Sequence, residues 1–141
     1  MIVLDTSVLS EPNRSRPSDA VADWFARQNM RNLFTTTVSE AEMLFGVALL
    51  PPGKRKDKLA AAFRTIFEVD FLGRVLVFDS AAARAFAELS AMRKKAGLEI
   101  KVLDTQIAAI ARAHRAAVAT RDVKDFEGFG IPILNPWTSA A

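Results

Sequence analysis

The chain has 141 residues, half of them hydrophobic, and a formal net charge of +3. This length fits one domain spanning residues 1–141, which can bury about two-thirds of the surface that its unfolded chain exposes. The absence of cysteine excludes a disulfide scaffold and thiolate metal sites. The apolar run at residues 2–4 is too short for a signal peptide, and no later run reaches membrane-spanning length. We therefore expect a cytoplasmic protein with no membrane partner and enough spare apolar surface for a homodimer.

Apolar periodicity, helix caps and chain breakers predict ten elements along the chain. These are a strand at 2–5, a helix capped by Ser18 and running to about Met30, a strand at 33–36, a helix from Ser39 toward Leu50, a helix from Arg55 to about Phe67, a strand at 75–78, a helix at 81–95 capped by Asp79 or Ser80, a helix at 103–114, and strands at 117–120 and 131–134. Strands that alternate with helices favour an α/β fold. We expect a three-layer α/β/α domain with a mainly parallel central sheet, followed by a C-terminal tail at about 135–141.

Four acidic side chains occur in unusually apolar sequence: Asp5, Glu42, Asp104 and Asp122. Asp5 closes the first predicted strand, and Asp122 follows the strand at 117–120. Glu42 and Asp104 stand near the start of stretches with helical apolar spacing. The carboxyl ends of parallel strands and the starts of the helices that follow them meet at one edge of the sheet. We therefore expect the four carboxylates to share one crevice.

Three of these acids also have purely structural explanations that the sequence leaves open. Asp5 could bond to amides in the loop after its strand, and Asp104 could be the N-cap of its helix. Glu42 lies three residues after Ser39, the spacing of a capping box in which Glu reaches back to the N-cap amide. In each of these cases the carboxylate would stabilise a local turn and would have no chemical role.

Two further acids compete with members of this set. Glu40 lies two residues before Glu42, and residues two apart point to nearly opposite sides of a helix, so only one of them can face the crevice. Asp125 lies one turn after Asp122, and either of them could cap the short segment at 123–128. We select Glu42 and Asp122, and leave open whether Glu40 or Asp125 contributes.

Converging carboxylates must take up protons or bind cations, because two of them about 5 Å apart repel by roughly 3 kcal/mol at an effective dielectric near 20. An all-oxygen site suits Mg²⁺ or Mn²⁺, whereas the absence of cysteine and the single histidine, His114, argue against zinc. Such an ion can activate a water molecule and neutralise the charge that grows on a phosphate. The acids therefore predict a phosphodiesterase.

Several other side chains carry weaker signals. Thr6 and Thr120 lie beside Asp5 and Asp122 and could orient the carboxylates or a bound water, although turn chemistry explains both threonines nearly as well. His114 lies late in a helix between arginines, and we assign it no catalytic part. The aromatic residues at helical spacing are predicted to be core, not base-stacking platforms: Trp24, Phe25, Phe63, Phe67 and Phe86. The basic triplets at 54–56 and 93–95 fit either an anionic partner or solvated helix ends.

Four segments of the chain resemble, in order, the motifs of PIN-domain ribonucleases, and in particular the VapC toxins of type II toxin–antitoxin pairs in their FitB-like branch. The segments are Asp5-Thr6-Ser7-Val8-Leu9-Ser10, Ser39-Glu40-Ala41-Glu42-Met43-Leu44-Phe45-Gly46, Asp104-Thr105-Gln106-Ile107-Ala108-Ala109 and Thr120-Arg121-Asp122-Val123-Lys124-Asp125-Phe126. The chain departs from the common pattern at Ser7 and at Asp122, where many members carry Asn.

The resemblance implies a Mg²⁺-dependent endoribonuclease that cuts RNA, works as a homodimer and is inhibited by a cognate antitoxin. It also implies that Asp5, Glu42, Asp104 and Asp122 form the catalytic and metal-binding set. Two other classes remain open. A PIN-like subunit could bind RNA or protein without cutting it, although no acid of the motifs is lost here. A phospho-acceptor receiver domain would need paired acids after its first strand, where this chain has Thr6 after Asp5.

Overall fold

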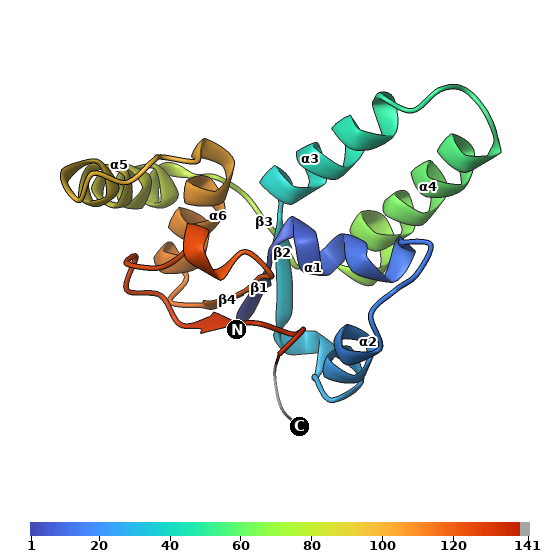
Figure 1. The fold of residues 1–141 in the computed structure, drawn as a ribbon, viewed down its shortest axis with the longest axis horizontal. Helices are drawn as coiled ribbons and strands as arrows, with labels where there is room; N and C mark the ends of the chain where they lie inside the picture. Colours follow the sequence, from blue (N-terminus) through green and yellow to red (C-terminus); the bar gives the residue numbers. More distant parts are fainter. Residues whose placement is uncertain (139–141) are drawn as a thin grey trace.

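The computed structural model describes residues 1–138 as a sheet of five parallel strands between two layers of helices (Figure 1). The strands are β1 (Ile2–Leu4), β2 (Leu33–Thr36), β3 (Val75–Leu76), β4 (Ala117–Ala119) and β5 (Ile133–Leu134), in the spatial order β3-β2-β1-β4-β5. All four neighbouring pairs are parallel. The predicted three-layer α/β/α fold is confirmed, and β1, β3, β4 and β5 are one or two residues shorter than predicted.

Six α-helices cover this sheet. They are α1 (Thr6–Ser10), α2 (Asp19–Ala26), α3 (Thr37–Ala48), α4 (Lys54–Thr65), α5 (Ser80–Lys95) and α6 (Val102–Ala113), with 3₁₀ turns at Glu11–Asn13, Met30–Asn32 and Val123–Asp125 and a π-helical turn at Ile66–Asp70. Asp79 caps α5, because its side chain accepts a hydrogen bond from the Ala82 amide. Asp79 was one of the two caps predicted for this helix. Beyond the end of α5, Gly97 adopts a positive φ of 73°.

Three predictions of helix bounds were wrong. The loop expected directly after β1 is instead the short helix α1 and a 3₁₀ turn. Helix α2 ends at Ala26 and not near Met30, because the Asn29 side chain accepts a hydrogen bond from the Arg31 amide and starts a separate turn. Helix α3 begins at Thr37, because the hydroxyl of Thr36, not that of Ser39, caps its first turn.

Two apolar cores form, one on each face of the sheet, because side chains along a strand alternate between faces. Val3 of β1 and Val118 of β4 pack with α5 and α6. The next residues, Leu4 and Ala119, pack on the opposite face with α1 to α4. The aromatic residues predicted to be core follow the same division. Trp24, Phe25, Phe63 and Phe67 belong to the second core or pack against it, and Phe86 packs against the first.

The order of the strands reverses direction at β1. From β1 the chain builds outward to β2 and β3 on one side, then returns to add β4 and β5 on the other (Figure 1). The carboxyl ends of β1 and β4 therefore flank a topological switch point, the position at which open α/β sheets place their ligands. Among residues 1–138 no helix is both long and apolar enough to span a membrane.

Part of the predicted tail is packed and not free. Pro136 is buried, Trp137 lies against the second core, and the guanidinium of Arg121 stands 5.3 Å from the centre of the Trp137 ring. Residues 139–141, the rest of that predicted tail, lie outside the described residues.

Candidate active site

Asp5 lies at the centre of the switch point and is almost fully buried, with 3% of its surface exposed. Its backbone amide donates to the Ala119 carbonyl, which extends the pairing of β1 with β4 to the carboxyl edge. One carboxylate oxygen, Oδ2, accepts hydrogen bonds from the hydroxyls of Thr120 (2.8 Å) and Ser7 (3.0 Å). Burial raises the pKa of Asp5, against the opposing effect of these hydrogen bonds, and the nearby Asp122 charge raises it further.

Glu42 projects from α3 toward Asp5 and is held by a hydroxyl. The Oγ1 atom of Thr6 donates to Glu42 Oε1 at 2.9 Å, and the same atom hydrogen-bonds with the hydroxyl of the fully buried Ser39 at 2.9 Å. Burial raises the pKa of Glu42, and the charge of Asp5 adds to the increase. Ser39 lies inside the helix, so the capping-box explanation of Glu42 is wrong.

Asp104 has the most strongly perturbed carboxyl group of this cluster. Burial and then the negative charges of Asp5, Asp125 and Glu42 raise its pKa from 3.8 to about 7, and the charge of Lys101 opposes them. Asp104 lies in the first turn of α6, whose N-cap is Lys101, so the N-cap explanation of Asp104 is also wrong. A carboxylate in that turn interacts favourably with the helix dipole, but three acidic neighbours outweigh this effect.

Asp122 and Asp125, the two rivals of the last motif, differ in their surroundings. Asp122 is exposed, and its amide donates a hydrogen bond to Thr120 Oγ1 at 2.9 Å. Its negative charge contributes to the raised pKa of Asp5. Its side chain makes no capping hydrogen bond to the following 3₁₀ turn. Asp125 pairs with the ammonium group of Lys101 through both oxygens, at 3.0 and 3.1 Å. Asp125 therefore borders the cluster but carries its own counter-charge.

The structure thus brings the four selected acids together at one edge of the sheet. Electrostatic coupling links Asp5 to Glu42, Asp104 and Asp122, whereas Glu40 is not among the acids that raise the pKa of Asp104. Hard carboxylate oxygens with an excess of negative charge match the preference of Mg²⁺ or Mn²⁺. Within residues 1–138, however, no three Asp, Glu or His side chains are arranged so that they could hold one ion together. The chemistry of the donors fits a divalent cation, but the side chains do not form a closed ligand cage.

Three contributors to this cluster escaped the sequence analysis. Ser7 was considered only as a departure from a motif, yet its hydroxyl donates to Asp5 and accepts from the Arg121 amide at 3.2 Å. Ser39 was taken for a helix cap. Lys101, which was not selected at all, lies 24 residues from its partner Asp125. A serine two residues after a strand-end acid is the one signal that could have identified Ser7, because that spacing allows a local side-chain hydrogen bond.

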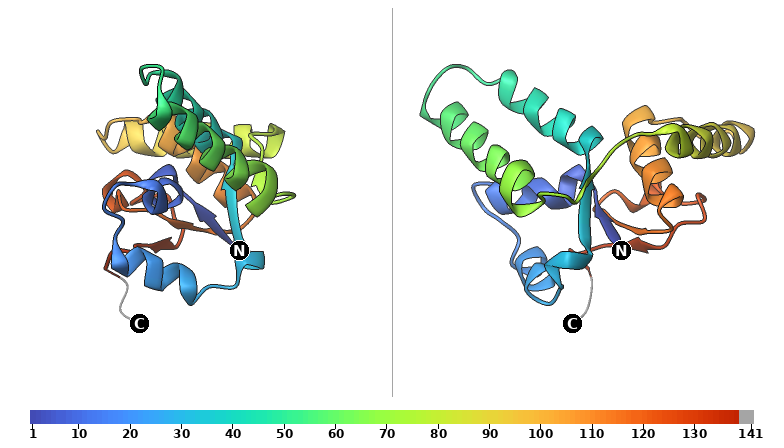
Figure 2. Two further views of the ribbon diagram at one scale, coloured as in Figure 1. Left: turned by 90° about the vertical axis from the view of Figure 1, so that its right-hand side faces the viewer. Right: turned by 180° about the vertical axis from the view of Figure 1, so that it is seen from behind.

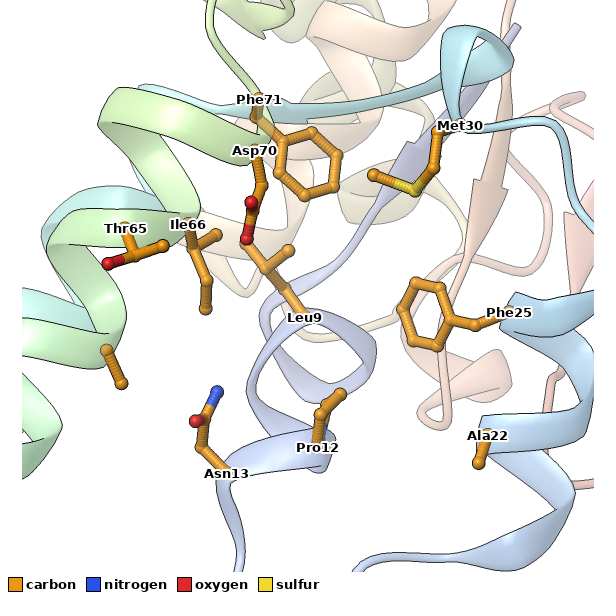
Figure 3. A pocket seen from close by; sticks show the side chains of 11 residues that line it. Leu9, Pro12, Asn13, Ala22, Phe25, Met30, Thr65, Ile66, Asp70 and Phe71 are labelled. Carbon is orange, nitrogen blue, oxygen red and sulfur yellow. The ribbon is translucent and has the colours of Figure 1, made fainter.

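A cavity larger than the depressions that Glu42 and Asp122 line lies elsewhere. It has a volume of about 590 Å³ and is bounded by α1, α2 and the end of α4. Figure 3 shows the side chains of Leu9, Phe25 and Ile66 around it. Its lining is mostly apolar and includes none of the four acids, so volume alone does not identify the chemical site in this protein. Glu42 instead lines a smaller depression of about 340 Å³, and Asp122 lines a separate one of about 380 Å³.

Comparison with known families identifies the fold. A model of the PIN domain matches residues 2–130. The chain belongs to the PIN domain family. The resemblance to VapC-type toxins noted in the four motifs is confirmed by relatives that match this PIN domain over nearly all of its length.

Three relatives and one solved structure illustrate the similarity. Plasmid stability protein StbB of Pseudomonas syringae is 44% identical over 97% of this chain and 99% of its own. VapC ribonuclease Y4jK of Sinorhizobium fredii is 42% identical over 99% and 100%, and toxin FitB of Neisseria gonorrhoeae is 37% identical over 97% and 99%. A chain in the structure of FitAB bound to an IR36 DNA fragment superimposes with a TM-score of 0.93 at 37% identity, covering 100% of this chain and 99% of that chain.

Proposed function

We propose that this PIN domain is the toxin of a toxin–antitoxin pair and acts as a metal-dependent endoribonuclease. The observation that carries the proposal is the cluster of Asp5, Glu42 and Asp104 at the switch point, where burial and mutual repulsion raise all three pKa values. Such a cluster disfavours the folded state unless protons or a cation neutralise its charge. The relatives support this assignment, since one is named a VapC ribonuclease and another a toxin.

In this proposal Asp5 and Asp104 hold a divalent cation directly, Mg²⁺ or in its place Mn²⁺, while Asp122 and Glu42 contribute through further ligation or bound water. When bound there, such a cation would make a water molecule nucleophilic at neutral pH and would neutralise charge on the phosphate. Thr120 and Ser7 fix the orientation of the Asp5 carboxylate, and Thr6 fixes that of Glu42. The products expected of the hydrolysed RNA are 5′-phosphate and 3′-hydroxyl ends.

Two protein partners complete the proposal. Apolar side chains on α3 and at the start of α6 are exposed: Phe45 by 65%, Leu49 by 69% and Leu103 by 47%. We assign this surface to a homodimer contact, because exposed apolar patches of this kind mark protein interfaces. The structure of the relative FitAB supports the other partner, a cognate antitoxin that would inhibit this chain.

The test is RNA cleavage by Asp5→Asn and Asp104→Asn with Mg²⁺ or Mn²⁺, after circular dichroism has confirmed folding. The matched control is Glu88→Gln, which removes an exposed carboxylate that pairs with Arg112 on the surface. We expect each site variant to lose about 100-fold or more of its cleavage rate, while the control stays within about twofold. Full activity in either site variant would reject the assignment. RNA binding without cleavage by the wild-type protein would favour a non-catalytic PIN-like subunit instead.

A further inference from the structure

A groove that carries basic side chains on its α4 side runs between α1 and α4, next to the acidic cluster. Helix α4 runs beside α3, and α1 lies next to α3 on the same side of the sheet (Figure 1, Figure 2). Two depressions follow each other along these helices. The first, of about 280 Å³, has a mostly apolar lining that includes the hydroxyls of Thr6 and Ser10 and the cation Arg55. The second, of about 450 Å³, is more polar and is lined by Arg14, Arg55 and Lys58 among others.

The first depression adjoins the acidic cluster through a shared threonine. Thr6, which lines it, donates a hydrogen bond to Glu42 at 2.9 Å. Arg55 lines both depressions and so connects them. A chain of phosphates that leaves the cluster along this groove would meet hydroxyl groups first and then two or three cationic side chains.

The charges along the groove are available to a ligand. The guanidinium of Arg14 pairs with the carboxylate of the buried Glu11 at 3.5 Å, so its positive charge is partly neutralised. Arg55 and Lys58 are exposed, and no carboxylate lies within 4 Å of either cationic group in residues 1–138. Because they are one helical turn apart on α4, they point to the same side of it.

The basic residues at the start of α4 also interact unfavourably with the dipole of that helix. Lys54, Arg55 and Lys56 are the first three residues of α4, where the helix dipole disfavours positive charge. Asp57 is the acidic residue of that turn, and Gly53 provides no side-chain cap. Basic residues at a helix N-terminus, with no ion pair to offset their unfavourable interaction with the helix dipole, are typical of a functional surface.

We propose that the groove between α1 and α4 binds the phosphate backbone of single-stranded RNA, with Arg55 and Lys58 as the phosphate contacts. The proposal rests on the ribonuclease function proposed above and adds to it the path by which the substrate reaches the acids. A contact to the backbone fits better than a base-specific contact, because the polar groups of the groove are mainly cations and hydroxyls, and Phe63, the aromatic residue among its lining, is buried.

The test measures binding without cleavage. A fluorescein-labelled, mixed-sequence 12-nucleotide RNA is titrated with protein in EDTA, at several NaCl concentrations between 50 and 200 mM. The variant Arg55→Glu/Lys58→Glu is compared with Lys94→Glu/Lys95→Glu, which makes the same change in net charge on the exposed end of α5, across the sheet from α4.

For single strands each phosphate contact contributes about 0.7 to the slope of log K against log salt. The α4 variant should therefore lose about 1.4 from this slope and bind roughly 10- to 30-fold more weakly at 100 mM NaCl. The α5 variant should keep the wild-type slope and lose less than about threefold. Folding is checked by thermal melting, where the α4 variant should melt no lower than wild type because its new acids suit the helix N-terminus.

Equal losses in both variants, no loss in the α4 variant, or no wild-type binding at 50 mM NaCl would each overturn the proposal. A deca-glutamate peptide serves as a second probe. If it binds wild type and loses affinity in the α4 variant while RNA binding is unchanged, the groove takes acidic protein segments and the RNA proposal is overturned. Failure of the nuclease proposal looks different: the groove would still bind RNA in EDTA, but Mg²⁺ would bring no cleavage.

Discussion

Two carboxylates in this protein are buried to the same extent but have opposite surroundings. Glu11 is 4% exposed, and its two oxygens face the Ser18 amide at 3.1 Å and the Arg14 guanidinium at 3.5 Å. Asp5 is 3% exposed and has two hydroxyl donors, no cationic partner in the described part of the chain, and three acidic neighbours.

Burial of an acidic side chain is therefore not by itself a sign of function. The fold neutralises Glu11 with its own atoms, so this residue is explained by structure alone. Around Asp5 the fold accumulates negative charge, which only protons or an external cation can neutralise. We therefore attribute the first region to stability and the second to ligand binding.

Among substitutions that leave the four acids in place, the largest effect is expected from Thr120, which links the Asp5 carboxylate to the Asp122 amide. Thr120→Val should lower the RNA cleavage rate by about 10- to 100-fold, because residues that orient ligands matter on that scale. The control is Thr65→Val, which removes an exposed hydroxyl that bonds only to the Ala61 carbonyl. Comparable rates for the two variants would show that the orientation of Asp5 is unimportant.

Substitution of Glu11 is expected to have a smaller effect, and on the stability of the protein, not on its activity. Glu11→Gln replaces a charge-assisted hydrogen bond to the Ser18 amide with a neutral one and removes the pairing with Arg14. The free energy of unfolding, measured in urea, should fall by about 1–2 kcal/mol, and the cleavage rate of the folded variant should not change. A loss of activity with unchanged stability would contradict the division between the two regions.

The smallest effect concerns pH and stability. The pKa of Asp104 is raised from 3.8 to about 7, so between about pH 4 and 7 the native state keeps a proton that the unfolded state has released. This group therefore makes the protein less stable as the pH rises through that window. Asp104 is only partly buried, so we expect Asp104→Asn to melt about 2–4 °C above wild type at pH 8 and at the same temperature at pH 4. An equal difference at both values would refute the assigned cause.

The sequence predicted much of this architecture because its strongest signals are local. The apolar runs at residues 2–4 and 117–119 set β1 and β4, and the acids that follow them lie at the carboxyl edge as expected. Caps were harder to assign. Thr36 and Ser39 are both plausible N-caps by residue type, and only the burial of Ser39 against Thr6 decides between them.

What the sequence could not supply is contact between distant segments. The five-residue helix α1 is too short to leave a periodic pattern, and its side chains are held by α3 and by the segment that follows β4. The pairing of Lys101 with Asp125 separates that acid from the uncompensated set, but a spacing of 24 residues carries no local signal. Asp122 and Asp125 could therefore be distinguished only in three dimensions.

Thermal unfolding at pH 7.5 shows whether the cluster around Asp5 binds a divalent cation. At 10 mM MgCl₂, with NaCl adjusted to equal ionic strength, an ion bound with a dissociation constant of about 1 mM would stabilise the protein by about 1.4 kcal/mol. We predict that the melting temperature of wild type rises by about 3–6 °C and that of Asp104→Asn by less than about 1 °C. The same rise in melting temperature in both proteins, or no rise in wild type, would show that the cluster around Asp5 does not bind Mg²⁺.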